Sequence, residues 1–470
     1  MFAVFSASAV RRRGAARRLT GAALMSGLIA MGSMAGAGVA AAADDVQHPG
    51  GAVATLDGLK TFDRAVLRTK GKTHEIPAGV FEMTVDGGGR LKTYCIDIHN
   101  PTQDQAKYLE TPWNQTSLGG NKDAGKIRWI LQHSYPQVDD LAALAKEAGT
   151  GPLSERTAAA GTQVAIWRYS DDADVDALDP AAEKLADWLE KEAKDAAEPR
   201  ASLSLEGNAV SGKAGGRLGP VTVRTDAGQV TVTPPADVAA SGVKITDAAG
   251  RPLTAVVNGA QLYFDVPAGA ADGSATLTAQ ATTSVPVGRA FAGVTKSQTQ
   301  ILAGSSESTV SASATATWAK AGAIPALSAK KNCAGGGVDI TAGNKGDAAF
   351  TFELTGFKHT IPAGASRTVT IPVAEDQAYD FTITRPDGFK KTFKGVLDCK
   401  TKGTAGPDIP SSQPSPASAG GTSGGLEGDL AETGSSSATP MIAGIAVALV
   451  VIGGGAVFFL RKKKPAATEE

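Results

Sequence analysis

The chain has few of the residues that build metal sites or attract nucleic acid. Its 470 residues include only three cysteines and five histidines, aromatic residues make up 5%, and the formal net charge is -1. A chain without a basic field has no general attraction for nucleic acid. The sequence contains no zinc-ligand spacing, no nucleotide-binding loop and no paired-carboxylate site. It therefore predicts no metal, no cofactor and no nucleic-acid partner.

The amino terminus has the three parts of a secretory signal peptide, which we place at residues 1–43. Five arginines come first, and they are Arg11, Arg12, Arg13, Arg17 and Arg18. A run of small and apolar residues follows over 19–40, and three alanines end it before Asp44. This order predicts an exported chain. An uncleaved membrane anchor is the alternative, and the paired arginines leave open which export route is used.

The carboxyl terminus also has three parts in a fixed order. The first is a pentapeptide made of Leu430, Ala431, Glu432, Thr433 and Gly434. An uncharged apolar run then covers 441–460, about 20 residues and so long enough for a transmembrane helix. A basic tail over 461–464 would hold that end in the cytoplasm. A plain single-span anchor would explain the helix and the tail but not the pentapeptide.

This order resembles a cell-wall sorting signal, in the Leu-Ala-x-Thr-Gly form used by class E sortases of high-GC Gram-positive bacteria. The resemblance implies that a sortase attacks the carbonyl of Thr433 and leaves the segment from Gly434 behind. Thr433 would then be joined to an amine of the cell-wall peptidoglycan. The expected localisation is secreted and covalently anchored to the cell wall, with 430–470 as a sorting signal whose membrane segment is transient.

Residues 55–200 show a mixed α/β pattern. Strands are predicted over 80–85 and 91–98, with a glycine-rich turn between them. Four helices are predicted after them, over about 122–133, 138–147, 154–169 and 180–197. Ser154 is a plausible N-cap, and Asp179 followed by Pro180 is another helix start. This region is expected to form the first domain.

From residue 201 the pattern becomes all-β. Short alternating runs divided by Gly, Pro and Asp predict a β-sandwich of the immunoglobulin-like kind over 201–328. A smaller β domain is predicted over 329–400. Residues 401–429 consist almost entirely of Gly, Ser, Pro, Thr and Ala, which predicts a disordered linker. The expected fold class is thus multidomain, with one mixed domain, two all-β domains, a linker and a carboxyl-terminal transmembrane helix.

The three cysteines divide into a candidate pair and a single thiol. Cys333 and Cys399 lie near the two ends of one β-patterned segment of an exported chain, so a disulfide is the natural interpretation, although spacing cannot prove it. Cys95 is left without a partner. It is either a buried thiol that packs like a small apolar side chain or a reactive group. His99 alone does not make a metal site.

Gln163 occupies an unusual position for a long amide. A helix over 154–169 places it on an apolar face, together with Ala159, Ala160, Val164 and Trp167. An amide at such a position is costly unless it is hydrogen-bonded. It is therefore either a satisfied core glutamine or one member of a reactive pair with Cys95, which lies within a predicted strand.

Two short motifs resemble the Cys–Gln thioester domain of Gram-positive surface adhesins. They are Tyr94-Cys95-Ile96 and the segment over 162–167, Thr-Gln-Val-Ala-Ile-Trp, where the family's motif reads Thr-Gln-x-Ala-[Ile/Val]-Trp. The resemblance covers about 55–200. It implies that Cys95 supplies the sulfur and Gln163 the acyl carbon of an internal thioester. Tyr94, Thr162 and Trp167 would form the pocket around it, with Asp97 and His99 as accessory groups.

The resemblance implies a surface adhesin that bonds covalently to an amine on a partner surface. Each thioester can react only once, so the chain is expected not to be an enzyme. Two alternatives remain: a passive wall-attached spacer or binding protein, and an enzyme with Cys95 as nucleophile and His99 or His133 as base. The sequence does not identify the amine-bearing partner.

Overall fold

The computed structural model describes residues 50–236, 241–384 and 390–401. They all belong to one compact unit, Met1–Pro416. The expected signal peptide at 1–43, the sorting signal with its apolar run, and all but the first residue of the linker at 401–429 lie outside the described residues. Within the described ranges, no helix is both long enough and apolar enough to cross a membrane.

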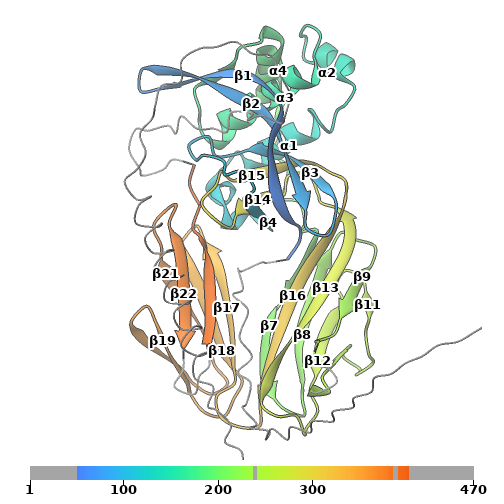
Figure 1. Ribbon diagram of the computed structural model, residues 1–470, viewed down its shortest axis with the longest axis vertical. Helices are drawn as coiled ribbons and strands as arrows, with labels where there is room; N and C mark the ends of the chain where they lie inside the picture. Colours follow the sequence, from blue (N-terminus) through green and yellow to red (C-terminus); the bar gives the residue numbers. More distant parts are fainter. Residues whose placement is uncertain (1–49, 237–240, 385–389, 402–470) are drawn as a thin grey trace, which may run out of the picture. The chain divides into compact units, whose positions relative to one another are not determined.

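The first domain is built on a sheet whose strands come from two distant parts of the chain. Its strands are β1 (Val53–Thr69), β2 (Lys72–Val85), β3 (Arg90–Cys95), β4 (Lys107–Thr111), β5 (Val175–Ala177), β14 (Ala290–Gly293) and β15 (Gln300–Ser305). Their order is β2-β3-β15-β14-β4-β1-β5, and β1 also pairs with β2. The sheet thus closes on itself, and β14 and β15 complete the ring between β3 and β4 (Figure 1).

Strands β14 and β15 do not belong to the domain in which they were expected. The sequence predicted that all of 201–328 forms the β-sandwich. Both strands bond to the first sheet, where Phe291 and Ile301 are buried. The physical reason is that β3 and β4 do not pair with each other and need partners for their backbone groups. The first domain is therefore discontinuous, and most of the all-β domain is inserted within it; the last strand of that domain, β16 (Glu307–Ala319), follows β15.

Four helices pack around this sheet. They are α1 (Ala124–Gln132), α2 (Leu141–Glu147), α3 (Glu155–Ser170) and α4 (Pro180–Glu192). The expected helix starts are confirmed, because Ser154 caps α3 in a capping box and Asp179 caps α4 with Pro180 after it. Helix α3 contacts β1, β2, α1 and α4. A Cβ added at Gly161 would lie 2.4 Å from the carbonyl oxygen of Ala182, so the two helices approach closely there.

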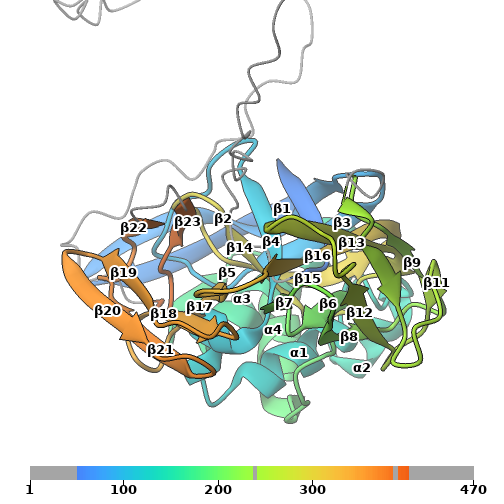
Figure 2. The ribbon, with the colours of Figure 1, turned by 90° about the horizontal axis from the view of Figure 1, so that it is seen from below.

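The inserted domain consists of two sheets, as the alternating pattern predicts. One has the order β10-β12-β8-β6, and the other has the order β11-β9-β13-β16-β7 (Figure 2). The long strands β13 and β16 pair along their whole length. The bounds are β6 (Leu203–Glu206), β7 (Ala209–Lys213), β8 (Arg217–Thr225), β9 (Val230–Thr233), β10 (Lys244–Thr246), β11 (Ala255–Val256), β12 (Gln261–Asp265), β13 (Gly273–Ser284) and β16 (Glu307–Ala319).

A smaller all-β domain follows. It has one sheet of order β17-β18-β21 and another of order β20-β19-β22-β23, and its apolar core includes Ile340, Phe350 and Phe393. A disulfide joins Cys333 and Cys399, as expected from the sequence. The bounds are β17 (Pro325–Asn332), β18 (Gly337–Asn344), β19 (Phe350–Leu354), β20 (Phe357–Ile361), β21 (Ser366–Pro372), β22 (Ala378–Thr384) and β23 (Lys390–Val396).

A buried ion pair holds β14 to the first domain. Arg289 precedes β14, and its Nε donates to Oε1 of Glu110 on β4 over 2.9 Å, with both side chains almost fully buried. Glu110 also accepts from the backbone N–H groups of Ala52 and Ser202. Arg289 in turn donates to Glu198. One carboxylate thus ties together the start of β1, the strand β4, the chain entering the inserted domain and the returning hairpin.

We expect Arg289→Met to lower the free energy of unfolding by about 3–5 kcal/mol, because it leaves a buried carboxylate without its cation. Urea unfolding of the variant measures this loss. Arg90→Met is the matched control, since Arg90 is largely exposed and pairs with Glu82 at 3.6 Å; its cost should stay below about 1 kcal/mol. Equal costs for the two variants would contradict a structural role for the buried pair.

Candidate functional site

The structure brings Cys95 and Gln163 into direct contact. Cys95 is the last residue of β3, Gln163 lies in the middle of α3, and both side chains are 0% exposed. The backbone N–H of Cys95 donates to Oε1 of Gln163 over 2.9 Å, and Nε2 of Gln163 donates to the carbonyl oxygen of Cys95 over 2.8 Å. The glutamine amide is thus satisfied by the backbone of the residue that carries the thiol.

The thiol of Cys95 is held in a dry and acidic environment. Its Sγ accepts a hydrogen bond from the backbone N–H of Asp97 over 3.2 Å. Burial raises the pKa of Cys95 well above its usual value, and the carboxyl groups of Asp171 and Asp97 raise it further. The indole N–H of Trp167 lies close enough to the Cys95 sulfur to lower this pKa in part. It makes no complete hydrogen bond to any described residue. The resting thiol is therefore protonated at neutral pH.

The other residues expected in the pocket are all buried around this pair. The hydroxyl of Tyr94 donates to the carbonyl oxygen of Tyr135 over 2.7 Å, and the hydroxyl of Thr162 donates to that of Ala158, also over 2.7 Å. Trp167 is 1% exposed. Both rings are thus closed off from solvent, and the indole of Trp167 lies near the Cys95 sulfur.

Helix α3 is more completely buried than a single apolar stripe implies. Every residue from Ala158 to Trp167 is buried, because the sheet, α1 and α4 cover the helix from several directions. Small residues make this possible, since the stretch contains four alanines and Gly161. Gln163 thus lies in an apolar environment, as expected. The predicted apolar stripe covers only part of the helix surface that is buried.

Two carboxyl groups near the pair were not recognised from the sequence as site residues. Asp171 is the C-cap of α3, and its Oδ1 accepts from the backbone N–H of Ile98 over 3.1 Å. Burial raises its pKa to about 7. Asp398 lies in the small β domain; its Oδ2 accepts from the hydroxyl of Thr299 over 2.6 Å, and burial raises its pKa to about 6. In the sequence, the position of Asp171 at the end of the Thr-Gln helix was the only indication that it could belong to the site. The residues around Asp398 gave no such indication.

The accessory residues named from the sequence have different surroundings. Asp97 is fully buried, and burial together with the charges of Asp398 and Asp171 raises its pKa well above the usual value. His99 is partly exposed. His133 stacks on Trp129 with ring centroids 3.9 Å apart, and its Nδ1 lies 2.8 Å from the carbonyl oxygen of Trp129. His133 is thus engaged on its own helix rather than with the thiol.

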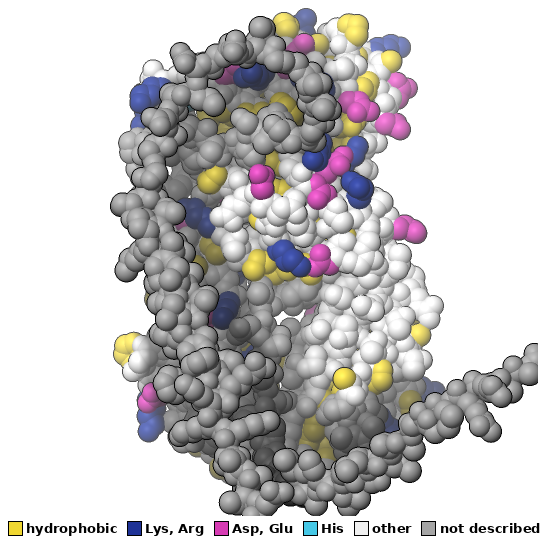
Figure 3. All heavy atoms as spheres, viewed as in Figure 1, with side chains coloured by type: hydrophobic (Ala, Val, Ile, Leu, Met, Phe, Trp, Pro, Cys, Tyr) yellow, Lys and Arg dark blue, Asp and Glu magenta, His cyan; other side chains and the backbone are white. Residues whose placement is uncertain are grey.

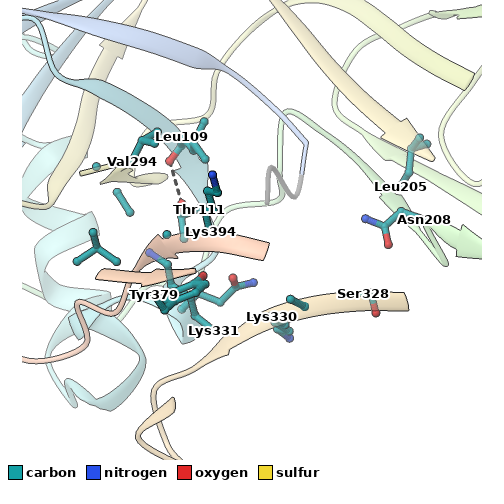
Figure 4. A pocket seen from close by; sticks show the side chains of 16 residues that line it. Leu109, Thr111, Leu205, Asn208, Val294, Ser328, Lys330, Lys331, Tyr379 and Lys394 are labelled. Carbon is teal, nitrogen blue, oxygen red and sulfur yellow. Dashed lines mark hydrogen bonds between the residues drawn. The ribbon is translucent and has the colours of Figure 1, made fainter. Parts of the chain in front are cut away.

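A hollow of about 240 Å³ lies elsewhere in the compact unit (Figure 4). Lys330, Lys331, Lys394 and Tyr379 lie on one side of it, and neither Cys95 nor Gln163 is among its lining residues. The hollow is therefore separate from the thiol and amide. On the face shown in Figure 3, positive and negative side chains are interspersed, as the small net charge leads one to expect.

The match to one family model agrees with this geometry. Residues 92–195 match the family model described as the thioester domain, and residues 319–396 match the one described as the C-terminal domain of bacterial phospholipase C. Among solved structures, the Bacillus anthracis TIE protein is similar at 14% identity, over 74% of this chain and 81% of that one, with a TM-score of 0.27.

The thioester domain of the Enterococcus faecium TIE86 protein is also similar, at 18% identity, over 59% of this chain and 99% of that one, with a TM-score of 0.27. No curated protein gives a significant match. The first family match spans Cys95 and Gln163, the two residues that the fold places in contact. The chain therefore contains a thioester domain, matched over residues 92–195.

Proposed function

We propose that the chain is a wall-anchored surface adhesin whose Cys95 and Gln163 form an internal thioester, which bonds covalently to an amine on a partner surface. The observation that carries this proposal is the pair of hydrogen bonds between the Gln163 amide and the Cys95 backbone. They hold the amide beside the thiol in a fully buried site. Such fixed proximity replaces an otherwise unfavourable encounter between two weakly reactive groups.

Formation of the thioester is an exchange within the site. The Sγ atom of Cys95 attacks Cδ of Gln163, the carbon–sulfur bond forms, and the carbon–nitrogen bond breaks. The thiol proton goes to the departing nitrogen, which leaves as ammonia. The backbone N–H of Cys95 already lies 2.9 Å from Oε1, the atom that gains negative charge in the tetrahedral intermediate.

Reaction with the partner converts the thioester back to an amide. A primary amine attacks the same carbon of Gln163, a new amide forms, and the carbon–sulfur bond breaks. The amine loses one proton and the sulfur gains one, so Cys95 returns as a thiol. Each molecule can react once, and the chain acts as a single-use electrophile rather than an enzyme.

Burial protects the thioester but also restricts access to it. Both reacting side chains are 0% exposed, and Trp167, which lies near the Cys95 sulfur, is 1% exposed. A dry site limits hydrolysis of the activated acyl group. An amine can reach the carbon only after a local movement of the surrounding side chains, so the partner amine is expected to contribute to opening the site.

We expect the purified protein to be lighter by one ammonia than the mass of its sequence with the Cys333–Cys399 disulfide formed, as measured by intact-mass spectrometry. Cys95→Ala and Gln163→Ala should each restore the full mass, because either change removes one reacting atom. Gln137→Ala is the control, since it deletes a part-buried glutamine amide that bonds to Ala303 in the same compact unit. A full mass for the unaltered protein would overturn the thioester and leave a passive spacer or a Cys95 enzyme.

The proposed attachment to the wall follows from the sorting motif. A sortase of the class E type would join Thr433 to the peptidoglycan after export, and the segment over 441–460 would hold the chain in the membrane until then. The adhesin would then be tied covalently at two points, at Thr433 to the wall and at Gln163 to its partner.

We expect Thr433→Ala to move the protein from the wall-bound fraction to the membrane fraction of the producing cell, because the acyl group taken by the sortase is changed. Immunoblots of the two fractions, before and after digestion of the wall, measure this. Thr422→Ala, in the linker, is the control and should stay wall-bound. Unchanged wall attachment of Thr433→Ala would contradict the proposed anchoring.

A further inference from the structure

Three acidic side chains of the small β domain converge near its disulfide. Glu375 and Asp376 lie between β21 and β22, and Asp398 follows β23 and directly precedes Cys399. One oxygen from each carboxylate lies within 4.8 Å of the others. This spacing brings three anionic oxygen donors to one point of the fold.

Each of these carboxylates is positioned by hydrogen bonds to one of its oxygens. Oε1 of Glu375 accepts from the backbone N–H groups of Cys399 over 2.5 Å and of Lys400 over 2.8 Å. Oδ2 of Asp398 accepts from Thr299 over 2.6 Å. The cluster is thus held in place by the backbone beside the disulfide and by a residue of the first domain.

Asp376 and a fourth carboxylate share one amide donor. Nδ2 of Asn100 donates to Oδ1 of Asp376 over 3.1 Å and to Oδ2 of Asp97 over 2.7 Å. Asp376 also pairs with Lys296 at 3.3 Å. Because one amide nitrogen bridges the two acids, Asp97 of the first domain lies beside the three acids of the small β domain.

Two buried oxygens in this group have no partner among the described residues. They are Oδ1 of Asp97, whose side chain is 0% exposed, and Oδ1 of Asp398, which is 8% exposed. A buried carboxylate oxygen without a donor is costly. Lys296 and Lys331 also lie near these acids. The group nevertheless keeps two buried oxygens that no described residue satisfies.

We propose that Glu375, Asp376 and Asp398 bind a calcium ion, with Asp97 held next to the site through Asn100. Calcium prefers carboxylate oxygens and accepts irregular coordination by several protein ligands. Magnesium is less suitable here, because it demands near-octahedral geometry and retains several waters, whereas the unpartnered oxygen of Asp398 is closed off from solvent.

Such an ion would lie next to the strand of the thioester pair, because Asn100 bridges its ligand Asp376 to Asp97. Asp97 is two residues from Cys95, and its backbone N–H donates to the Cys95 sulfur. Asp398 is one residue from the Cys333–Cys399 disulfide. A filled site would thus connect the reactive strand to the covalently clamped domain. The proposal rests on the carboxylates alone and holds whether or not the thioester forms.

Calcium titration of the purified, metal-free protein by isothermal calorimetry tests the site. We expect one calcium equivalent to bind and the unfolding temperature to rise. Asp376→Asn should weaken calcium binding by at least about tenfold, the loss typical even of residues that only support a metal's ligands. This variant suits the test because Asp376 has a φ of 61°, which asparagine tolerates, and the amide oxygen can still accept from Asn100.

Asp380→Asn is the matched control. Asp380 lies in the same domain, is exposed and pairs with Lys394 at 3.4 Å, so calcium binding should be unchanged. Asp398→Asn is a second variant with the same expected loss as Asp376→Asn. The proposal is overturned if the unaltered protein binds no calcium, if both cluster variants bind it as well as Asp380→Asn does, or if magnesium binds more tightly than calcium. If no calcium binds, the buried carboxyl groups are neutralised by protonation instead.

Discussion

The paired hydrogen bonds between Gln163 and the backbone of Cys95 are the contact on which the proposed chemistry of this protein depends. They cross from α3 to the end of β3 at 2.9 and 2.8 Å, inside a fully buried site. An amide in such a place needs both a donor and an acceptor, and the strand end supplies the two together. The same contact that gives the buried amide its hydrogen-bond partners also holds the acyl carbon beside the thiol. Stability and reactivity therefore rest on one geometry.

The rest of the fold serves to fix this strand end. Strand β3 is held between β2 and β15, and Gln300 of β15 lies opposite Cys95. Because β15 begins at Gln300, about 200 residues after Cys95 in the chain, the site is completed by a segment far away in the sequence. The Glu110–Arg289 pair secures that return, and the acidic residues beside the disulfide approach the same strand from the small β domain. The site thus depends on all three domains.

Local signals predicted much of this arrangement. The caps at Ser154 and Asp179 and the β texture after residue 200 each reflect short-range chemistry, and the structure agrees with them. The helical pattern over 154–169 located the helix of Gln163. The return of β14 and β15 and the approach of Asp398 were not predicted, because strand pairing between distant segments leaves no periodic trace in one sequence. The burial of Asp171 was missed for a similar reason, since a C-cap aspartate is ordinarily exposed.

Peptide mapping after treatment with methylamine tests the thioester most directly. If Cys95 and Gln163 are joined, the protein takes up one methylamine as an N-methyl amide on Gln163. Cys95 becomes open to alkylation after denaturation to the same extent, because one thioester yields one amide and one thiol. Methylamine on another glutamine, or an alkylatable Cys95 before any amine is added, would contradict the thioester. That result would leave Gln163 as a satisfied core residue beside an ordinary buried thiol.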